Sequence, residues 1–148
     1  MQSNHVHLIV EASDLDTLVG GMRGLCVRIA RAVNRAIGRR GRFFDDRWHG
    51  RELATPGEVR SVIIYVLANS QKHGAACSGL DPYSSAPYFN GFIEFGGKAP
   101  CEIERAMLPA WLARLAASER PVAPAQTWLL AVGWKRAGCI SLQDTPRA

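Results

Sequence analysis

The strongest constraint on the fold of this 148-residue chain is a helix start that leads directly into its longest apolar run. Thr55 can cap the helix, a proline follows in the first turn, and Glu58 stands three residues after the cap, the spacing of a capping box. The apolar run covers residues 62–68 and contains Tyr65. We therefore predict a helix over residues 56–72. In such a setting a tyrosine is most simply a core residue whose hydroxyl group is hydrogen-bonded.

Two segments upstream of this helix have the character of strands. In residues 5–10 two histidines and an isoleucine alternate with apolar residues, and residues 42–54 look like an extended strand with mixed faces. Between them we predict a long amphipathic helix that starts at a cap on Asp14 or Asp16 and runs to about Gly38. Its apolar stripe consists of Met22, Leu25, Cys26, Ile29, Val33 and Ile37.

The basic residues are mostly arginines, and they are concentrated in one part of the chain. The formal net charge is +5, and 15 of the 18 basic residues are arginine. Residues 20–60 hold ten of these arginines against four acidic residues. On the predicted helix, spacings of three and four residues bring a group of them into one row, namely Arg28, Arg31, Arg35 and Arg39. Because the planar guanidinium group suits phosphate oxygens, this segment predicts a polyanionic partner.

The C-terminal half carries fewer chemical signals. Residues 74–100 are rich in Gly, Pro, Ser and Tyr and predict a loop, and short helices are expected near 102–118 and 124–137. On these helices we interpret the tryptophans Trp111, Trp128 and Trp134 as packing residues. Four scattered cysteines without a C-x-x-C pair indicate reduced structural thiols.

The sequence also indicates where the protein works. No apolar run approaches the roughly 20 residues that span a bilayer, and the chain opens with polar residues rather than a signal peptide. We therefore expect a cytoplasmic protein without a membrane partner.

Two short motifs could carry chemistry. His5 and His7 are two residues apart, so on a strand their imidazoles would point to the same side and could both bind one metal ion. Tyr65 and Asn69 are four residues apart, so on a helix they would share a face. Tyr83 and Tyr88 lie in the predicted loop without such a neighbour, and they are weaker candidates for a reactive tyrosine.

Three segments together resemble a known family. Asn4-His5-Val6-His7-Leu8-Ile9-Val10, Arg39-Arg40-Gly41-Arg42-Phe43-Phe44 and Tyr65-Val66-Leu67-Ala68-Asn69 follow one another as do the signatures of the single-tyrosine HUH transposases. The most similar branch is that of the REP-associated tyrosine transposases, which are related to insertion-sequence transposases. The resemblance covers about residues 1–74, and residues 81–86 are also similar to a segment that follows the catalytic helix in some members.

This resemblance implies a fold, a reaction and a set of roles. The fold would be α+β, a ferredoxin-like HUH domain over residues 1–74 that lacks its first elements, with a loop and short-helix extension over 75–148. Tyr65 would attack single-stranded DNA to form a 5′-phosphotyrosine, and Mg²⁺ or Mn²⁺ would be bound by His5, His7 and Asn69. The partners would be single-stranded or hairpin DNA and a second copy of the chain. The implied DNA contacts are Arg28, Arg31, Arg35, Arg39, Arg42, Phe43, Arg47 and Trp48, with Phe44 and His49 as further stacking residues.

The sequence departs from the family in two respects. Ser70 follows Asn69 where the family usually has proline, and the chain begins at the His-x-His strand, which a strand, a helix and a strand precede in the family. A start further upstream, a truncated gene and a partner chain that fills the gap are all open explanations. Three other functions also stay open: an inactive remnant that binds DNA hairpins, a replication or relaxase nickase, and a metal-binding or structural domain.

Overall fold

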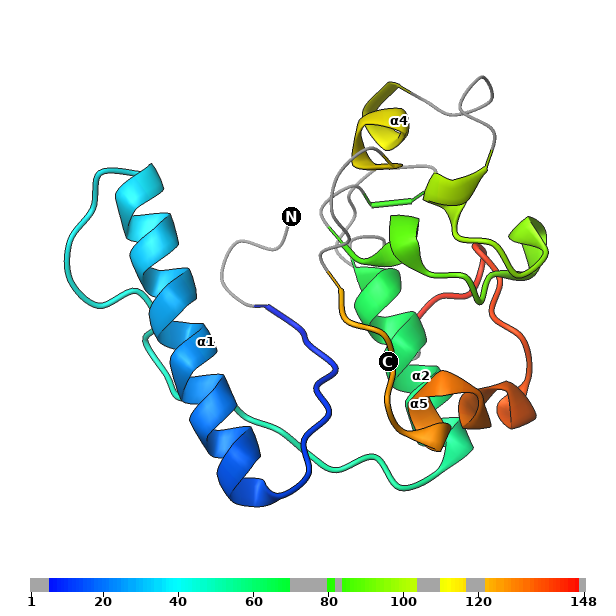
Figure 1. Ribbon diagram of the computed structural model, residues 1–148, viewed down its shortest axis with the longest axis horizontal. Helices are drawn as coiled ribbons and strands as arrows, with labels where there is room; N and C mark the ends of the chain where they lie inside the picture. The colour runs from blue at the N-terminus through cyan, green and yellow to red at the C-terminus, as the bar shows by residue number, and fades with distance from the viewer. Residues whose placement is uncertain (1–5, 70–79, 82–83, 104–109, 117–121, 147–148) are drawn as a thin grey trace. The chain divides into compact units, whose positions relative to one another are not determined.

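The computed structural model describes residues 6–69, 80–81, 84–103, 110–116 and 122–146, without the side chains of 111, 115 and 116 (Figure 1). The chain divides into two compact units. One unit, Val10–Glu52, contains helix α1 (Leu15–Ala36), and we name it the α1 unit. The other unit, formed by residues 1–9 and 53–148, contains helix α2 (Pro56–Leu67), and we name it the α2 unit.

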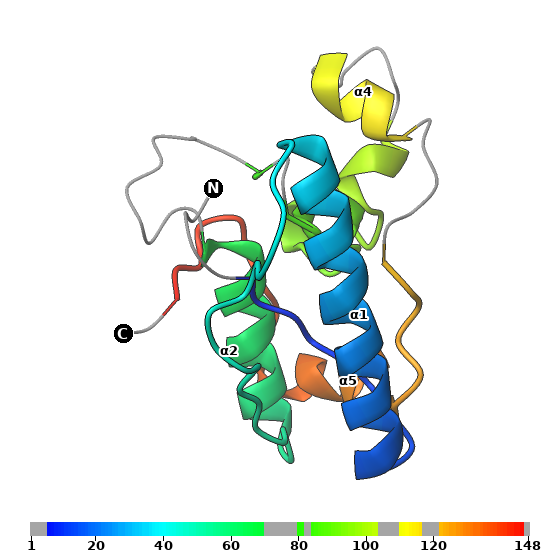
Figure 2. The same ribbon diagram turned by 90° about the vertical axis from the view of Figure 1, so that its left-hand side faces the viewer.

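Helix α1 confirms the prediction of a long helix in the first third of the chain. It is one continuous helix of 22 residues (Figure 2). Asp14 caps it and accepts a hydrogen bond from the Thr17 backbone N–H at 2.7 Å. After the C-cap, Gly38 adopts a left-handed conformation with φ of +67°, which glycine tolerates without a Cβ clash. The Asn34 side chain then donates to the Gly41 carbonyl at 2.8 Å and closes the turn.

Helix α2 begins as predicted and ends earlier. The capping box is complete, because Thr55 accepts from the Glu58 backbone N–H while the Glu58 carboxylate accepts from the Thr55 backbone N–H. The helix ends at Leu67, and Ala68, with φ of −106° and ψ of 14°, is its C-cap. The predicted end at residue 72 lies outside the described residues.

The rest of the α2 unit consists of short turns and helices. The predicted helix near 124–137 is two elements, a short α-helix and a 3₁₀ helix, and of the one predicted near 102–118 a 3₁₀ turn and one short helix are described. These elements are η1 (Ala86–Tyr88), η2 (Ile93–Phe95), η3 (Pro100–Glu102), α4 (Ala110–Ala116), α5 (Trp128–Ala131) and η5 (Gly133–Ala137). No helix in the described part of the chain is both long and apolar enough to cross a membrane.

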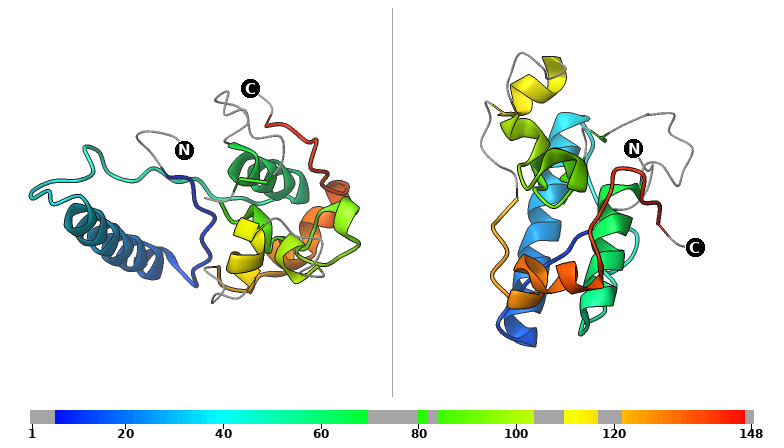
Figure 3. Two further views of the ribbon diagram at one scale, coloured as in Figure 1. Left: turned by 90° about the horizontal axis from the view of Figure 1, so that it is seen from above. Right: turned by 90° about the vertical axis from the view of Figure 1, so that its right-hand side faces the viewer.

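The core of the α2 unit forms around one side of α2, on which η5 and α5 pack (Figure 3). Its buried residues are Val59, Ile63, Ile64, Leu67, Ala86, Phe92, Trp134 and Ile140. A smaller cluster joins Tyr88, Ala99, Cys101 and Leu112. Thus the helix that carries Tyr65 is also the element against which the C-terminal segments pack.

The prediction of an α+β ferredoxin-like fold is wrong. The described part of the chain is mainly helical, and no strand or sheet forms within it. The described part of the first predicted strand, residues 6–10, and the second predicted strand, residues 42–54, have no neighbouring strand there with which to form a hydrogen-bonded ladder. The only described bridge is an isolated parallel pair, Phe92 with Ile140. Alternation of residues along the sequence is therefore not sufficient for a strand here, because a strand is stabilised by hydrogen bonds to a neighbouring strand.

A trace of the strand pattern nevertheless persists near the start of the chain. Val6 and Leu8 are exposed, whereas His7 and Ile9 are partly buried. Ile9 packs against the core around α2. The alternation thus turns His7 toward the α2 unit even without a sheet.

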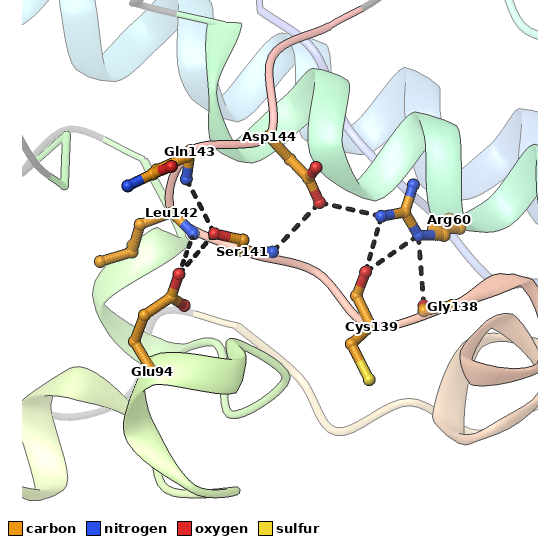
Figure 4. Close-up of polar contacts among 8 residues, drawn as sticks. All are labelled: Arg60, Glu94, Gly138, Cys139, Ser141, Leu142, Gln143 and Asp144. Carbon is orange, nitrogen blue, oxygen red and sulfur yellow. Dashed lines mark hydrogen bonds and ion pairs between the residues drawn. The ribbon is translucent and has the colours of Figure 1, made fainter.

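The C-terminal segment is fixed to α2 by one arginine (Figure 4). The Arg60 guanidinium donates to the carbonyl oxygens of Gly138 and Cys139, at distances from 2.6 to 3.2 Å. It also forms an ion pair with Asp144 at 2.9 Å. The same carboxylate oxygen of Asp144, Oδ2, also accepts a hydrogen bond from the Ser141 backbone N–H. Both side chains of the ion pair are mostly shielded from solvent, so water weakens the pair only in part.

Glu94 fixes the same segment from η2. Its carboxylate accepts hydrogen bonds from the Ser141 hydroxyl group and from the Leu142 backbone N–H. The hydrogen bond from Ser141 holds the pKa of Glu94 below its ordinary value of 4.5. In addition, the Ile93 backbone N–H donates to the Ile140 carbonyl at 2.9 Å.

We predict that Arg60→Ala destabilises the protein by about 1–2 kcal/mol, because two carbonyl groups and a carboxylate lose a charged donor. Denaturant unfolding measures this change. Arg114→Ala on α4 is the control, since it removes an exposed arginine from the same unit. Equal midpoints for the two variants would contradict a role of Arg60 in holding the C-terminal segment.

We also predict that Glu94 makes stability depend on pH in the acid range. Its pKa is lower in the folded than in the unfolded protein, so its contribution is present above pH 4.5 and is lost as the pH falls through the folded value. The difference in unfolding free energy between wild type and Glu94→Gln should therefore shrink on acidification. Urea unfolding at a series of pH values tests this, and a constant difference would disprove it.

Candidate functional site

The structure brings two of the predicted site residues into contact. The Tyr65 hydroxyl lies 3.4 Å from Nε2 of His7, 58 positions earlier in the sequence. The two rings meet edge to face, with centroids 4.8 Å apart and an interplanar angle of 84°. The distance exceeds the roughly 2.7–3.0 Å of a strong hydrogen bond to a hydroxyl group, so the two atoms lie side by side without a tight bond. Both residues are partly buried and belong to the α2 unit.

Asn69 follows the end of α2 and has a buried polar atom. Its Oδ1 atom exposes less than 1 Å² and accepts no hydrogen bond from any described residue. A buried carbonyl oxygen without a donor is costly, by about 1–3 kcal/mol, and such atoms are rare in folded proteins. The atom is therefore suited to a ligand that supplies positive charge or a donor.

The predicted metal ligands are only partly within the described residues. His5 lies outside them, whereas His7 and Asn69 are inside. No three His, Cys, Asp or Glu side chains gather among the described residues, so a metal ion here would depend on an amide oxygen and on His5. An imidazole nitrogen and an amide oxygen are both acceptable ligands for Mn²⁺, and the amide oxygen suits Mg²⁺. The two described candidates, His7 and Asn69, thus have the kinds of atom that a divalent cation takes as ligands.

The α1 unit carries the predicted basic surface. Arg28, Arg31 and Arg35 are all exposed on α1, as the sequence predicts. Residues 17–44 contain seven arginines and no acidic residue. The surface of this stretch is therefore positive without local compensation, which favours a polyanion.

Two of the predicted DNA contacts have a structural use as well. Arg39 donates to the Arg42 carbonyl at 3.2 Å, and Arg42 donates to the Phe44 carbonyl at 2.7 Å. These bonds hold the turn that follows α1. The spacing in the sequence predicts that Arg39 lies in one row with Arg35. Arg39 is not in this row on the helix, because α1 ends at Ala36.

The predicted stacking residues differ in exposure. Phe43 and Phe44 are partly buried against each other, with ring centroids 4.8 Å apart. Trp48 is 38% exposed, and Arg47 and His49 are exposed next to it. Of these aromatic side chains, Trp48 therefore offers more free surface than the phenylalanines.

The C-terminal tryptophans correct the interpretation of all three as packing residues. Trp134 is 3% exposed and belongs to the core, as expected. Trp128 is 52% exposed, so it is not a core residue, and the side chain of Trp111 is not among those described. Cys26, Cys101 and Cys139 are free thiols, in agreement with the sequence, while Cys77 lies outside the described residues.

Of the other two tyrosines, only Tyr88 lies among the described residues. Tyr88 is buried at 8% exposure in the smaller core cluster, and Tyr83 lies outside the described residues. Sequence reasoning missed Arg60, because no local motif indicates that its partners lie 78 to 84 residues further along the chain.

Comparison with known proteins adds no family to these observations. No family model matches the chain, and neither a curated protein nor a solved structure matches it.

Proposed function

We propose that this protein is a transposase that cuts and rejoins single-stranded DNA, with Tyr65 as the nucleophile. The observation that supports the proposal is the contact of the Tyr65 hydroxyl with Nε2 of His7 at 3.4 Å. Asn69 adds to it, since its buried Oδ1 atom accepts no hydrogen bond from the described residues. A phenol, an imidazole and an unused amide oxygen are the groups that the resemblance to HUH transposases requires.

The reaction is a transfer of the phosphodiester to the phenol. The Tyr65 oxygen forms a bond to phosphorus, and the bond from phosphorus to the 3′ oxygen breaks. The phenol loses its proton and the leaving 3′ oxygen gains one, so the products are a 5′-phosphotyrosine and a free 3′-hydroxyl group. Because the ester retains the bond energy, a 3′-hydroxyl group of another strand can reverse the step without ATP.

A divalent cation fits this reaction and these residues. His5, His7 and Asn69 would hold Mg²⁺ or Mn²⁺, which when bound polarises the phosphate and stabilises the charge that develops on it. His7 would thus be a ligand of the cation and a neighbour of the nucleophile at the same time. The ring contact with Tyr65 fixes the phenol beside it.

The surface of the α1 unit is the proposed DNA contact. Exposed arginines at three- and four-residue spacing on one helix can follow a phosphate backbone. Trp48, with 38% of its surface exposed, could stack on an unpaired base. Hairpin-forming DNA as the substrate, a homodimer as the assembly and the cytoplasm as the location are part of the proposal, and they come from the resemblance and the composition.

The competing proposal is a protein that binds DNA hairpins without cutting them. The observation that favours it is the lack of a sheet among the described residues, because residues 6–9 then have no ladder to hold His7 in place. Binding through the arginines needs no such precision. A cleavage assay separates the two functions.

We predict that wild-type protein forms a covalent adduct with single-stranded hairpin DNA taken from the flanks of its own gene. The adduct should require Mg²⁺ or Mn²⁺ and should be absent from Tyr65→Phe, which has no hydroxyl group to attack phosphorus. A denaturing gel with labelled DNA measures it. Tyr88→Phe is the matched control, because Tyr88 is a tyrosine of the same unit that lies in the smaller core cluster. Hairpin binding without any adduct would favour the competing proposal.

We also predict that the arginine row sets the salt dependence of DNA binding. Replacing Arg28, Arg31 and Arg35 by alanine should make the slope of log affinity against log salt shallower by about 2, at roughly 0.7 per lost phosphate contact. Alanine favours helices, so α1 should persist. Fluorescence anisotropy with a single-stranded oligonucleotide measures the slope.

The comparison variant for this experiment is Arg39→Ala with Arg42→Ala. These arginines hold the turn after α1, so their loss should lower the stability of the α1 unit as well as the affinity. An unchanged slope in the triple variant would disprove the role of the row.

A further inference from the structure

A second basic and aromatic surface lies on α5 and η5. The guanidinium carbon of Arg136 is 4.9 Å from the ring centroid of Trp128, and Nζ of Lys135 is 5.6 Å from that of Trp134. Both distances lie within the range of cation–π contacts. Lys135 and Arg136 are exposed, and Trp128 exposes 52% of its surface. We name Trp128, Lys135 and Arg136 the indole–cation patch.

The charge of this patch is not compensated nearby in the sequence. Residues 122–143 contain no acidic residue. The next one, Asp144, forms its ion pair with Arg60. Neither Lys135 nor Arg136 has a carboxylate partner among the described residues. Two cations next to each other in the sequence are therefore available to a negatively charged ligand.

The patch rests on a well-fixed scaffold. Thr127 caps α5 by accepting a hydrogen bond from the Leu130 backbone N–H. The indole of Trp128 packs so closely on Gly133 that a Cβ atom there would lie 2.7 Å from the ring, so only glycine permits this arrangement. The following residues are held through the bonds of Arg60 to Gly138 and Cys139. The ring and the cation are thus positioned in advance, which lowers the entropy cost of binding.

The position of the patch in the fold connects it with the candidate site. Element η5 packs on α2, the helix that carries Tyr65, and both belong to the same unit (Figure 1). We infer that the indole–cation patch is a binding surface for single-stranded DNA, with the two cations on phosphates and the exposed part of the Trp128 ring under a base. This inference rests on the proposed function. It adds a contact surface on the catalytic unit, separate from the arginines of the α1 unit.

Single-stranded DNA is the partner that the chemistry favours. A guanidinium lying on an indole keeps its N–H edge free, and that edge binds phosphate oxygens in pairs. Aromatic platforms beside positive charge bind unpaired bases, whereas the bases of a duplex are stacked and unavailable. An anionic membrane surface would use the same cations, so it is the alternative to be tested.

The experiment measures the affinity of a labelled single-stranded oligonucleotide without a hairpin, by fluorescence anisotropy over a range of salt. All proteins carry Tyr65→Phe, so covalent reaction cannot contribute. Lys135→Ala with Arg136→Ala should make the salt slope shallower by about 1.4, at roughly 0.7 per phosphate. Lys98→Ala with Arg114→Ala is the matched control, because it removes one exposed lysine and one exposed arginine from the same unit.

The role of the ring is tested separately. Trp128→Ala should weaken binding by at least about fivefold, the lower end of the cost of losing one base–aromatic stack. Trp128→Phe keeps an aromatic face and should retain most of the affinity. Denaturant unfolding of each variant identifies any that fail to fold, and the exposed Lys135 and Arg136 variants decide the question in that case.

Three results would overturn the inference. In the first, the patch variants bind DNA with the salt slope of wild type. In the second, the control pair lowers the salt slope as much as the patch pair does, so net charge by itself explains the effect. In the third, the patch variants lose binding to vesicles of anionic lipid and keep binding to DNA. The adduct assay with intact Tyr65 is independent. If the adduct forms and the patch variants bind DNA as wild type does, only this inference is refuted. If the patch variants bind DNA more weakly and no adduct forms, only the proposed reaction is refuted.

Discussion

Burial of one face of α2 is the constraint on which the rest of the α2 unit depends. Val59, Ile63, Ile64 and Leu67 are each less than 9% exposed, and burial of a side chain of this size contributes about 1.5–3 kcal/mol. The partners of these side chains come from turns and short helices that could not persist alone, because isolated helices of a few residues are unstable in water. Arg60, on the same helix, donates hydrogen bonds to the backbone carbonyl groups of Gly138 and Cys139 and so attaches the C-terminal segment to α2. The described segments α5 and η5 therefore pack on α2 and in turn hold α2 in place.

This packing has a consequence for the chemistry. Tyr65 follows the buried Ile64 directly. The helix that carries the Tyr65 ring is therefore held in place by the core that packs on its buried side. The hydroxyl group reaches His7 because Ile9 attaches the first segment to the same core. The contact of His7 with Tyr65 thus depends on apolar side chains of the core. Asn69 comes directly after the C-cap of α2, and its buried Oδ1 atom accepts no hydrogen bond from the described residues.

The arginines serve two different purposes. Arg60, Arg39 and Arg42 donate to carbonyl oxygens and stabilise segments of the chain. Arg28, Arg31 and Arg35 point from a helix surface into solvent, and Arg136 lies on an indole. Residue type and spacing do not separate these groups, because the same fork of N–H donors suits a carbonyl oxygen and a phosphate oxygen alike. Only the position of each side chain relative to a neighbouring backbone distinguishes a structural arginine from one that is free to bind.

The sequence by itself determined the helix starts, because capping depends on residues within four positions of each other. Thr55 caps α2 as its local sequence requires, and Asp14, one of the two candidates, caps α1. Gly38 ends the first helix region with the conformation that favours glycine. The sequence predicts His7 and Tyr65 as residues of one site through the resemblance, but it does not predict the contact between their side chains. The tertiary structure decided the rest. The alternating residues 6–9 did not become a strand, since no described neighbour pairs with them, and an exposed Trp128 was distinguished from a buried Trp134. The tertiary structure also brings Arg60 to Asp144. A contact between residues 84 positions apart depends on how the core packs, so no local sequence pattern indicates it.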